Sequence, residues 1–253
     1  MKITFLGTGT SQGVPVIACD CIVCSSKNTK DKRLRSSVMI DVNNNVFVID
    51  AGPDFRTQML RANVKHLDAV ILTHAHKDHI AGLDDVRAFN FIQKKAIDVY
   101  SREDVQSAIR NEFSYAFAVY KYPGVPEINL QKVENKAFEI NGVKIIPIEV
   151  KHMELKIFGY RIGDFTYITD CNYISEEEFE KIKGSKVIVL NALRRKKHVS
   201  HFTLDEAVAI LERLKPERAY LTHISHMLGL HDEVEKELPS FIHLAYDGLI
   251  IEL

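Results

Sequence analysis

The chain has 253 residues, 46% of them hydrophobic, which is enough to bury the core of one large domain or two small ones. Its formal net charge of -1 gives no bulk electrostatic reason to expect a nucleic-acid or membrane partner. No apolar run approaches the roughly 20 residues that cross a bilayer. The first residues, MKITFLGTGTSQG, lack the apolar core of a secretory signal and lead directly into a strand pattern. We therefore expect a cytoplasmic protein.

The predicted elements begin with strands and continue with strands mixed with helices. Apolar runs bounded by turn residues predict strands at 2–7, 37–42, 45–52, 67–73, 143–150, 156–162, 165–169, 186–192, 218–223 and 243–253. Helical spacing predicts helices at 54–64, 176–183 and 204–214, the last with Ser200 or Thr203 near its N-terminal cap. No repeat or linker divides the chain, so we expect one domain over residues 1–253, of α/β (α+β) class, with two sheets covered by helices.

The segment LTHAHKDHIAGL follows one of these buried strands and concentrates His74, His76, Asp78 and His79 within six residues. In extended backbone, alternate spacing points His74 and His76 to one side. Asp78 and His79 lie one turn further on and can serve a second ion. Imidazole and carboxylate together suit Zn(II), Mn(II) or Fe(II). A solvated loop rich in histidine is the alternative, but the pattern favours a metal site.

The THAHKDH motif resembles the signature of the metallo-β-lactamase superfamily. This resemblance implies a four-layer αββα sandwich with a metal site at one edge of the two sheets, and further ligands downstream. Matching positions at predicted strand ends are His152, Asp170 and His223. By the resemblance, one ion binds His74, His76 and His152, the other binds Asp78, His79 and His223, and Asp170 bridges them.

Asp50, in the segment VIDAGPDF, resembles the buried aspartate that this superfamily has near its metal site. The resemblance implies that Asp50 orients ligands through hydrogen bonds without binding metal itself. An aspartate that forms the turn before Ala-Gly is the alternative interpretation.

A second cluster, ACDCIVC, spaces Cys19, Cys21 and Cys24 as C-x-C-x2-C. Thiolates this close repel one another unless a cation holds them, so the loop at 19–24 predicts a structural zinc site that a histidine completes. Both His226 and His231 could be that fourth ligand. Small buried apolar side chains are the alternative interpretation of the three cysteines, and packing is the expected role of the remaining one, Cys171.

Together with GTGTSQGVP and LTHISH, this cysteine spacing resembles the phosphoribosyl cyclic phosphodiesterase branch of the superfamily, which acts in phosphonate breakdown. The branch resemblance implies one structural zinc held by Cys19, Cys21, Cys24 and His226. It also implies that His201 acts at the substrate phosphate and protonates the leaving alkoxide. His198, three residues earlier, competes for that role.

These inferences predict a metal-dependent hydrolase, a phosphodiesterase that cleaves a small (cyclic) phosphodiester. Two divalent ions, Zn, Mn or Fe, would activate a hydroxide, with Asp78, Asp170 and His201 as catalytic residues. The alternatives are a ribonuclease Z-like nuclease, a thioesterase, or a metal-binding protein without catalysis. A nuclease would need a long basic arm for RNA, and none is visible.

Two further segments leave alternatives open. The basic run at 194–197 either binds a second phosphate of the substrate or is a solvated loop. The aromatic stretch at 113–122 could stack a base or sugar, form a lid, belong to the core, or form a homodimer interface. The expected partner is a small phosphodiester substrate, with no membrane partner and no positive reason for nucleic acid.

Overall fold

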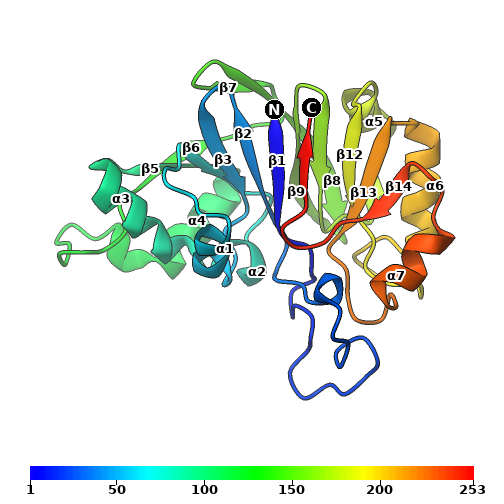
Figure 1. Ribbon diagram of the computed structural model, residues 1–253. Coiled ribbons are helices and arrows are strands. Elements are labelled where there is room, and N and C mark those ends of the chain that lie inside the picture. Colours follow the sequence, from blue (N-terminus) through cyan, green and yellow to red (C-terminus); the bar gives the residue numbers. More distant parts are fainter.

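The strands of the computed structural model, which describes residues 1–253, form two sheets that lie face to face (Figure 1). The first sheet has seven strands in the order β15-β1-β2-β3-β4-β5-β6. These strands are β15 (Ile250–Glu252), β1 (Lys2–Gly7), β2 (Ser37–Val42), β3 (Asn45–Ile49), β4 (Ala69–Ile71), β5 (Ile97–Ser101) and β6 (Ile128–Lys132).

The second sheet follows the order β11-β8-β9-β10-β12-β13-β14, and β7 pairs with β8 beside this path. Its strands are β11 (Tyr173–Ile174), β8 (Val143–His152), β9 (Leu155–Ile162), β10 (Phe165–Ile168), β12 (Val187–Asn191), β13 (Arg218–Thr222), β14 (Ile242–Leu244) and β7 (Phe138–Ile140). The segment 243–253, predicted as one strand, is therefore two, because β14 pairs with β13 while β15 pairs with β1 in the other sheet.

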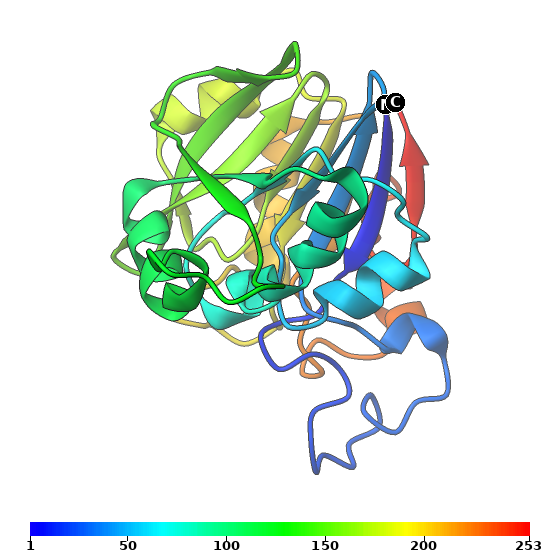
Figure 2. The ribbon, with the colours of Figure 1, turned by 90° about the vertical axis from the view of Figure 1, so that its left-hand side faces the viewer.

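Helices cover the outer face of each sheet, as Figures 1 and 2 show. The first sheet carries α1 (Phe55–Arg61), α2 (Lys77–Ile80), α3 (Arg87–Gln93) and α4 (Glu103–Glu112), and the second carries α5 (Glu176–Ile182), α6 (Leu204–Leu214) and α7 (His231–Val234). Single 3-10 turns are η1 (Thr29–Asp31), η2 (Leu83–Val86), η3 (Ser114–Ala116) and η4 (Glu235–Glu237). The predicted four-layer sandwich is confirmed, and no helix has the length and apolar character needed to cross a membrane.

Three apolar cores hold the layers together. The core between the sheets contains Phe5 and Phe47 of the first sheet and Phe158 and Tyr160 of the second. The other two cores bury the inward faces of the helices against the outer faces of the sheets. Each Å² of apolar surface removed from water in these cores stabilises the fold by about 25 cal/mol, and this burial holds sheets and helices together.

Parallel strands bring distant parts of the chain to one edge of the sandwich. Strands β3, β4, β5 and β6 are mutually parallel, as are β10, β12, β13 and β14. Their carboxyl ends meet at the edge from which a long loop projects, away from the two termini (Figure 1). This loop, residues 10–34, returns to the sandwich where Gly9 forms bridges with Arg35 and with Ile224.

Candidate metal centre

Three of the predicted site residues come just after the end of a strand, and each of the three has a left-handed backbone conformation. Asp50 follows β3 with φ 66°, Asp170 follows β10 after one intervening residue with φ 55°, and His223 follows β13 with φ 56°. Left-handed backbone costs roughly 1–3 kcal/mol for a residue other than glycine and is concentrated at functional sites. The sharp turn that it gives points these side chains across the edge of the sandwich.

The first group of donor atoms comes from His74, His76 and His152, which lie within 4.8 Å of one another. His152 Nδ1 lies 2.7 Å from the Asp170 carbonyl oxygen, so this nitrogen donates and Nε2 stays free to bind a metal. His74 is fixed in the same way, because its Nδ1 lies 3.0 Å from the Thr73 hydroxyl. That hydroxyl in turn donates to Asp50 at 2.9 Å.

The second group consists of Asp78, His79, Asp170 and His223. The two groups are adjacent, since the rings of His74 and His79 have centroids 4.1 Å apart. Asp170 Oδ2 lies 3.2 Å from His79 Nε2 and 3.1 Å from His223 Nδ1. Its other oxygen, Oδ1, lies 3.0 Å from His201 Nε2. Asp170 is therefore the residue on which both groups converge, as a bridging ligand would be.

The chemistry of these donors fits divalent metal. His79 Nε2 is buried between the Asp78 and Asp170 carboxylates, each 3.2 Å away, yet it makes no hydrogen bond. A buried imidazole nitrogen that faces two carboxylates without a hydrogen bond is well placed to share a divalent ion with them. Burial also lowers the pKa of His223 to about 4, so its imidazole is neutral and can act as a ligand at pH 7.

Asp50 occupies the position expected for an orienting residue. Its buried carboxylate accepts a hydrogen bond from His79 Nδ1 at 2.7 Å and another from the Thr73 backbone N–H at 2.9 Å. Burial raises the pKa of Asp50, and the contacts with His79 and Thr73 oppose that rise. These contacts fix the ring of His79 so that Nε2 points at the other carboxylates.

His201 lies at the same centre, whereas His198 does not reach it. Besides its contact with Asp170, His201 is grouped with His152, and its Nδ1 lies 2.8 Å from the Ser200 hydroxyl. His198 contacts only Ser200, at 3.1 Å, and His201, at 3.3 Å. The cap of α6 is Thr203, which forms a capping box with Glu206, and this leaves Ser200 free to orient His201.

The three clustered cysteines meet a histidine from the other end of the chain. The Sγ atoms of Cys19, Cys21 and Cys24 lie 3.3, 3.3 and 3.4 Å from His226 Nδ1. Tetrahedral zinc bonds of about 2.3 Å to sulfur and 2.0 Å to nitrogen place those atoms about 3.5 Å apart. A hydrogen bond from the Cys24 amide lowers the pKa of Cys21 to about 6, which favours the thiolate.

The remaining histidine and cysteine candidates lie elsewhere. His231 Nδ1 accepts a hydrogen bond from the buried Arg33 guanidinium at 3.1 Å, so this imidazole does not face the thiols. Cys171 is fully buried in the core under the helices of the second sheet. Burial raises the pKa of its thiol, as expected for a packing residue.

Most cations of the basic run already have partners. Arg195 donates to both carboxylate oxygens of Glu237, at 2.9 and 2.8 Å, and Lys197 pairs with Glu206. The Arg194 guanidinium donates to two carbonyl groups of its own loop. Lys196 alone is exposed without an ion pair or side-chain hydrogen bond, so the run is a weaker phosphate clamp than its sequence suggests.

Hydroxyl groups beside the ligands were not predicted from the sequence. Thr73 orients His74, Ser36 Oγ lies 3.2 Å from His223 Nδ1, and Thr169 donates to Asp170 at 2.7 Å. A signal was present, because His74, Asp170 and His223 each directly follow a threonine at a strand end. Ser36 gives no such signal, since it reaches His223 only through the fold.

The sequence and structure have relatives of known family. The family model described as beta-lactamase superfamily domain matches residues 45–224. This range contains both groups of donor residues at the histidine-rich centre, but it contains none of Cys19, Cys21, Cys24 and His226. The crystal structure of a diphosphatase from the PhnP family superposes with a TM-score of 0.93 at 43% identity, covering 100% of this chain and 97% of that one. Zn(2+)-bound PqqB from Methylobacterium extorquens shares the fold, with a TM-score of 0.81 at 19% identity over the full length of both chains.

Curated relatives match over part of their own length. The octanoyltransferase of Porphyromonas gingivalis is 40% identical over 253 residues, which is 98% of this chain and 51% of the relative. Ribonuclease Z of Prochlorococcus marinus is 28% identical over 174 residues, which is 65% of this chain and 50% of the relative. The chain thus spans about half the length of the curated relatives that it matches.

Proposed function

The chain belongs to the beta-lactamase superfamily, in the branch of the PhnP-family diphosphatase, and from this premise we propose that it is a metal-dependent hydrolase of small phosphodiesters. The observation that carries the proposal is the convergence of two ligand groups on Asp170, with His201 at 3.0 Å from the same carboxylate. Similarity to a diphosphatase and to ribonuclease Z supports a phosphorus centre as the site of attack.

The ligand groups would hold two divalent ions, which, when bound, supply an acidified water and positive charge beside the phosphate. Zn or Mn suits the mixture of imidazole and carboxylate. The Cys19, Cys21, Cys24 and His226 set would hold one structural zinc. Thr73, Asp50 and Ser36 keep the ligand side chains in place through the contacts described above.

His201 is the group that acts on the leaving alcohol. Its ring is held between Ser200 Oγ and Asp170 Oδ1, and it remains slightly exposed at the surface of the site. As water attacks phosphorus, the bond to the ester oxygen breaks, and the departing alkoxide takes a proton from His201. The proton that the attacking water loses passes to solvent, and His201 is reprotonated from solvent before the next turnover. General acid catalysis of this kind typically contributes about 10²–10⁴-fold.

A second candidate is a thioesterase for a medium-chain acyl group. The 40% identity with a segment that makes up about half of an octanoyltransferase favours it. Exposed apolar side chains close to the metal-centre histidines favour it as well. Met153 and Val199 are both more than half exposed, and each lies within two residues of His152 or His201. Asn172 connects these two residues, accepting from the Met153 N–H and donating to the Val199 carbonyl.

The test is a substrate panel with protein reconstituted separately with Zn and Mn. It contains cyclic and linear phosphodiesters, inorganic diphosphate, octanoyl thioesters and structured RNA. We expect the highest kcat/KM on a small phosphodiester. Preferred turnover of octanoyl thioesters over every phosphorus substrate would replace the proposal with the second candidate, and metal binding without turnover of any substrate would contradict both.

A further inference from the structure

One face of the molecule carries large apolar side chains that nothing in the chain covers. Phe91 and Ile92 of α3, together with Val119, Tyr120 and Tyr122 of the loop between η3 and β6, are between 67% and 94% exposed. We call these five residues the α3 face. Most other large apolar side chains of the protein are buried in its three cores. A group of exposed apolar residues with a charged rim marks an interaction surface.

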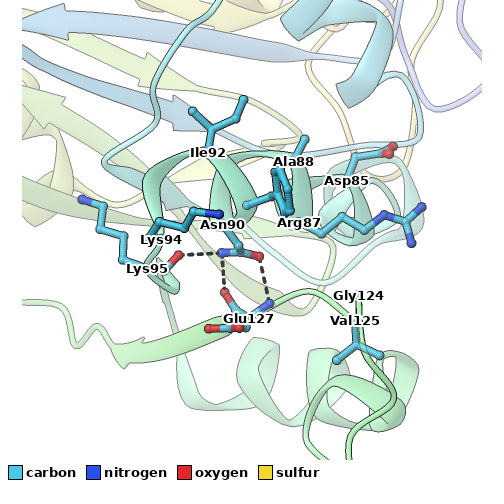
Figure 3. A pocket seen from close by; sticks show the side chains of 11 residues that line it. Asp85, Arg87, Ala88, Asn90, Ile92, Lys94, Lys95, Gly124, Val125 and Glu127 are labelled. Atoms are coloured by element: carbon cyan, nitrogen blue, oxygen red, sulfur yellow. Dashed lines mark hydrogen bonds between the residues drawn. The ribbon is translucent and has the colours of Figure 1, made fainter.

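The α3 face includes a preformed hollow of about 770 Å³, which Figure 3 shows from close by. Asn90 holds its two walls together, because its side-chain amide donates to the carbonyls of Lys95 and Glu127 at 3.0 Å and accepts from the Glu127 N–H at 2.9 Å. The walls are therefore α3 on one side and residues 124–127 on the other. No metal-ligand candidate lines this hollow.

Tyr122 stands close to the hollow, and Tyr120 lies two residues earlier in the same loop. A smaller depression lies next to the hollow and is lined in part by Tyr122. The two share Gly124, Val125 and Glu127 as lining residues. A concave and a convex apolar element thus share one wall. The exposed aromatics at 120 and 122 are of the right kind to enter a hollow lined by Phe91 and Val125.

The charges around the hollow have both signs. Arg87, Lys94 and Lys95 line it together with Asp85 and Glu127. Arg87 pairs with Asp84 at 3.2 Å and Lys95 lies 4.0 Å from Asp68, which leaves Lys94 as the cation without an ion pair. A nucleic-acid or acidic membrane partner would favour a surface of one positive sign. A twofold interface instead presents the same patch on both partners, so it needs projection, hollow, cation and anion on a single face.

From this self-complementary arrangement we propose that a second copy of the chain docks on the α3 face and forms a twofold dimer. Tyr120 and Tyr122 of each copy enter the hollow of the other, and Lys94, which has no ion pair within its own chain, meets Asp85 and Glu127 across the axis. Aromatic side chains that fill pockets are typical anchors of such interfaces. The proposal depends on no metal and on no assumption about the substrate.

The experiment compares the mass of the metal-loaded protein in solution with that of two variants, by sedimentation or light scattering over a dilution series. We expect a dimer, and we expect the double variant Tyr120→Ser/Tyr122→Ser to raise the dimer dissociation constant by about tenfold or more. The matched control is Tyr173→Ser, a change at a half-exposed tyrosine in β11, which should leave the dimer intact.

Thermal unfolding of each variant at a concentration where all are monomeric distinguishes weakened association from misfolding. A wild-type chain that stays monomeric throughout the series would overturn the proposal. A dimer that tolerates the double variant as well as the control would also overturn it, because association would then use another surface.

Discussion

Asp50 is the residue expected to orient a metal ligand without binding metal itself. The carboxylate is fully buried and accepts hydrogen bonds from His79 and from the Thr73 N–H. Replacing it with a neutral amide leaves the size of the side chain nearly unchanged but removes the charge. The orientation of His79 would then no longer be fixed by an ionic hydrogen bond.

We predict that Asp50→Asn lowers metal affinity by about 10–100-fold, the range observed when the partner of a metal-binding histidine is changed. The measurement is competitive titration with a chelator, followed by metal analysis. Asp41→Asn, an exposed carboxylate on β2, serves as the control. If the Asp50→Asn variant had the metal affinity of the wild-type protein, the assignment of an orienting role to Asp50 would be wrong.

His201 and His198 provide a matched pair for separating acid catalysis from metal binding. We predict that His201→Ala keeps the metal content but lowers kcat by about 10²–10⁴-fold on an alkyl diester. A nitrophenyl diester, whose leaving group needs little protonation, should be partly spared. His198→Ala should lose much less, because His198 does not contact Asp170. Loss of metal in the His201 variant would make this residue a ligand instead.

At the scale of single elements, the apolar patterns predicted most strands within a few residues, but only three of the seven α-helices, namely α1, α5 and α6. The helix at 204–214 has the predicted bounds, because its capping box and apolar spacing are both local. The edge where the histidine and aspartate candidates meet was also predictable, since each of them lies at or just beyond the end of a predicted strand. What remained open was which strands pair, because pairing depends on contacts between distant segments.

The C-terminal segment illustrates this limit. An apolar pattern from 243 to 253 reads as one strand, but Asp247 accepts hydrogen bonds from the Thr8 and Leu34 N–H groups at 2.9 and 2.8 Å. This contact turns the chain from one sheet to the other. Helices α3 and α4 were not predicted because few of their residues are buried; α4, for example, buries only Val105 and Ile109.

The basic loop gives a prediction about substrate charge. Since Arg195 and Lys197 are already paired and Lys196 is not, Lys196→Glu should raise KM for a substrate with a second phosphate and barely affect bis(nitrophenyl) phosphate. Binding energy that is equal in ground and transition states acts mainly on KM. Steady-state kinetics with both substrates test this.

Arg195→Gln is the matched control for the loop, since it breaks the pair with Glu237 but leaves Lys196 in place. It should change KM for neither substrate by a comparable amount. An equal loss on both substrates in the Lys196 variant would indicate a general field effect, and the loop would then have no specific phosphate site.

At the scale of the whole molecule, the loop at 10–34 links the two ends of the chain. Its cysteines meet His226, and Arg33 at its base donates to Thr8 at 2.8 Å and to the Ala245 carbonyl at 2.6 Å. The superfamily match at 45–224 includes neither partner of the cysteine site. The site thus lies outside the part of the chain that holds the histidine–carboxylate groups, and the two should respond differently to metal removal.

We predict that Cys21→Ser removes one zinc equivalent and lowers the free energy of unfolding, because a closed site contributes its binding energy to folding. Asp20→Asn, in the same loop but without a thiol, should change neither.

In the wild-type protein, a mild chelator should abolish activity before it lowers the melting temperature, since the histidine–carboxylate groups would keep open positions and exchange their ions more readily. Metal analysis, thermal unfolding and activity measured on the same samples test this order. A Cys21→Ser protein with wild-type metal content and melting temperature would show that the cysteines hold no structural ion. Simultaneous loss of activity and stability would show that the two sites are not independent.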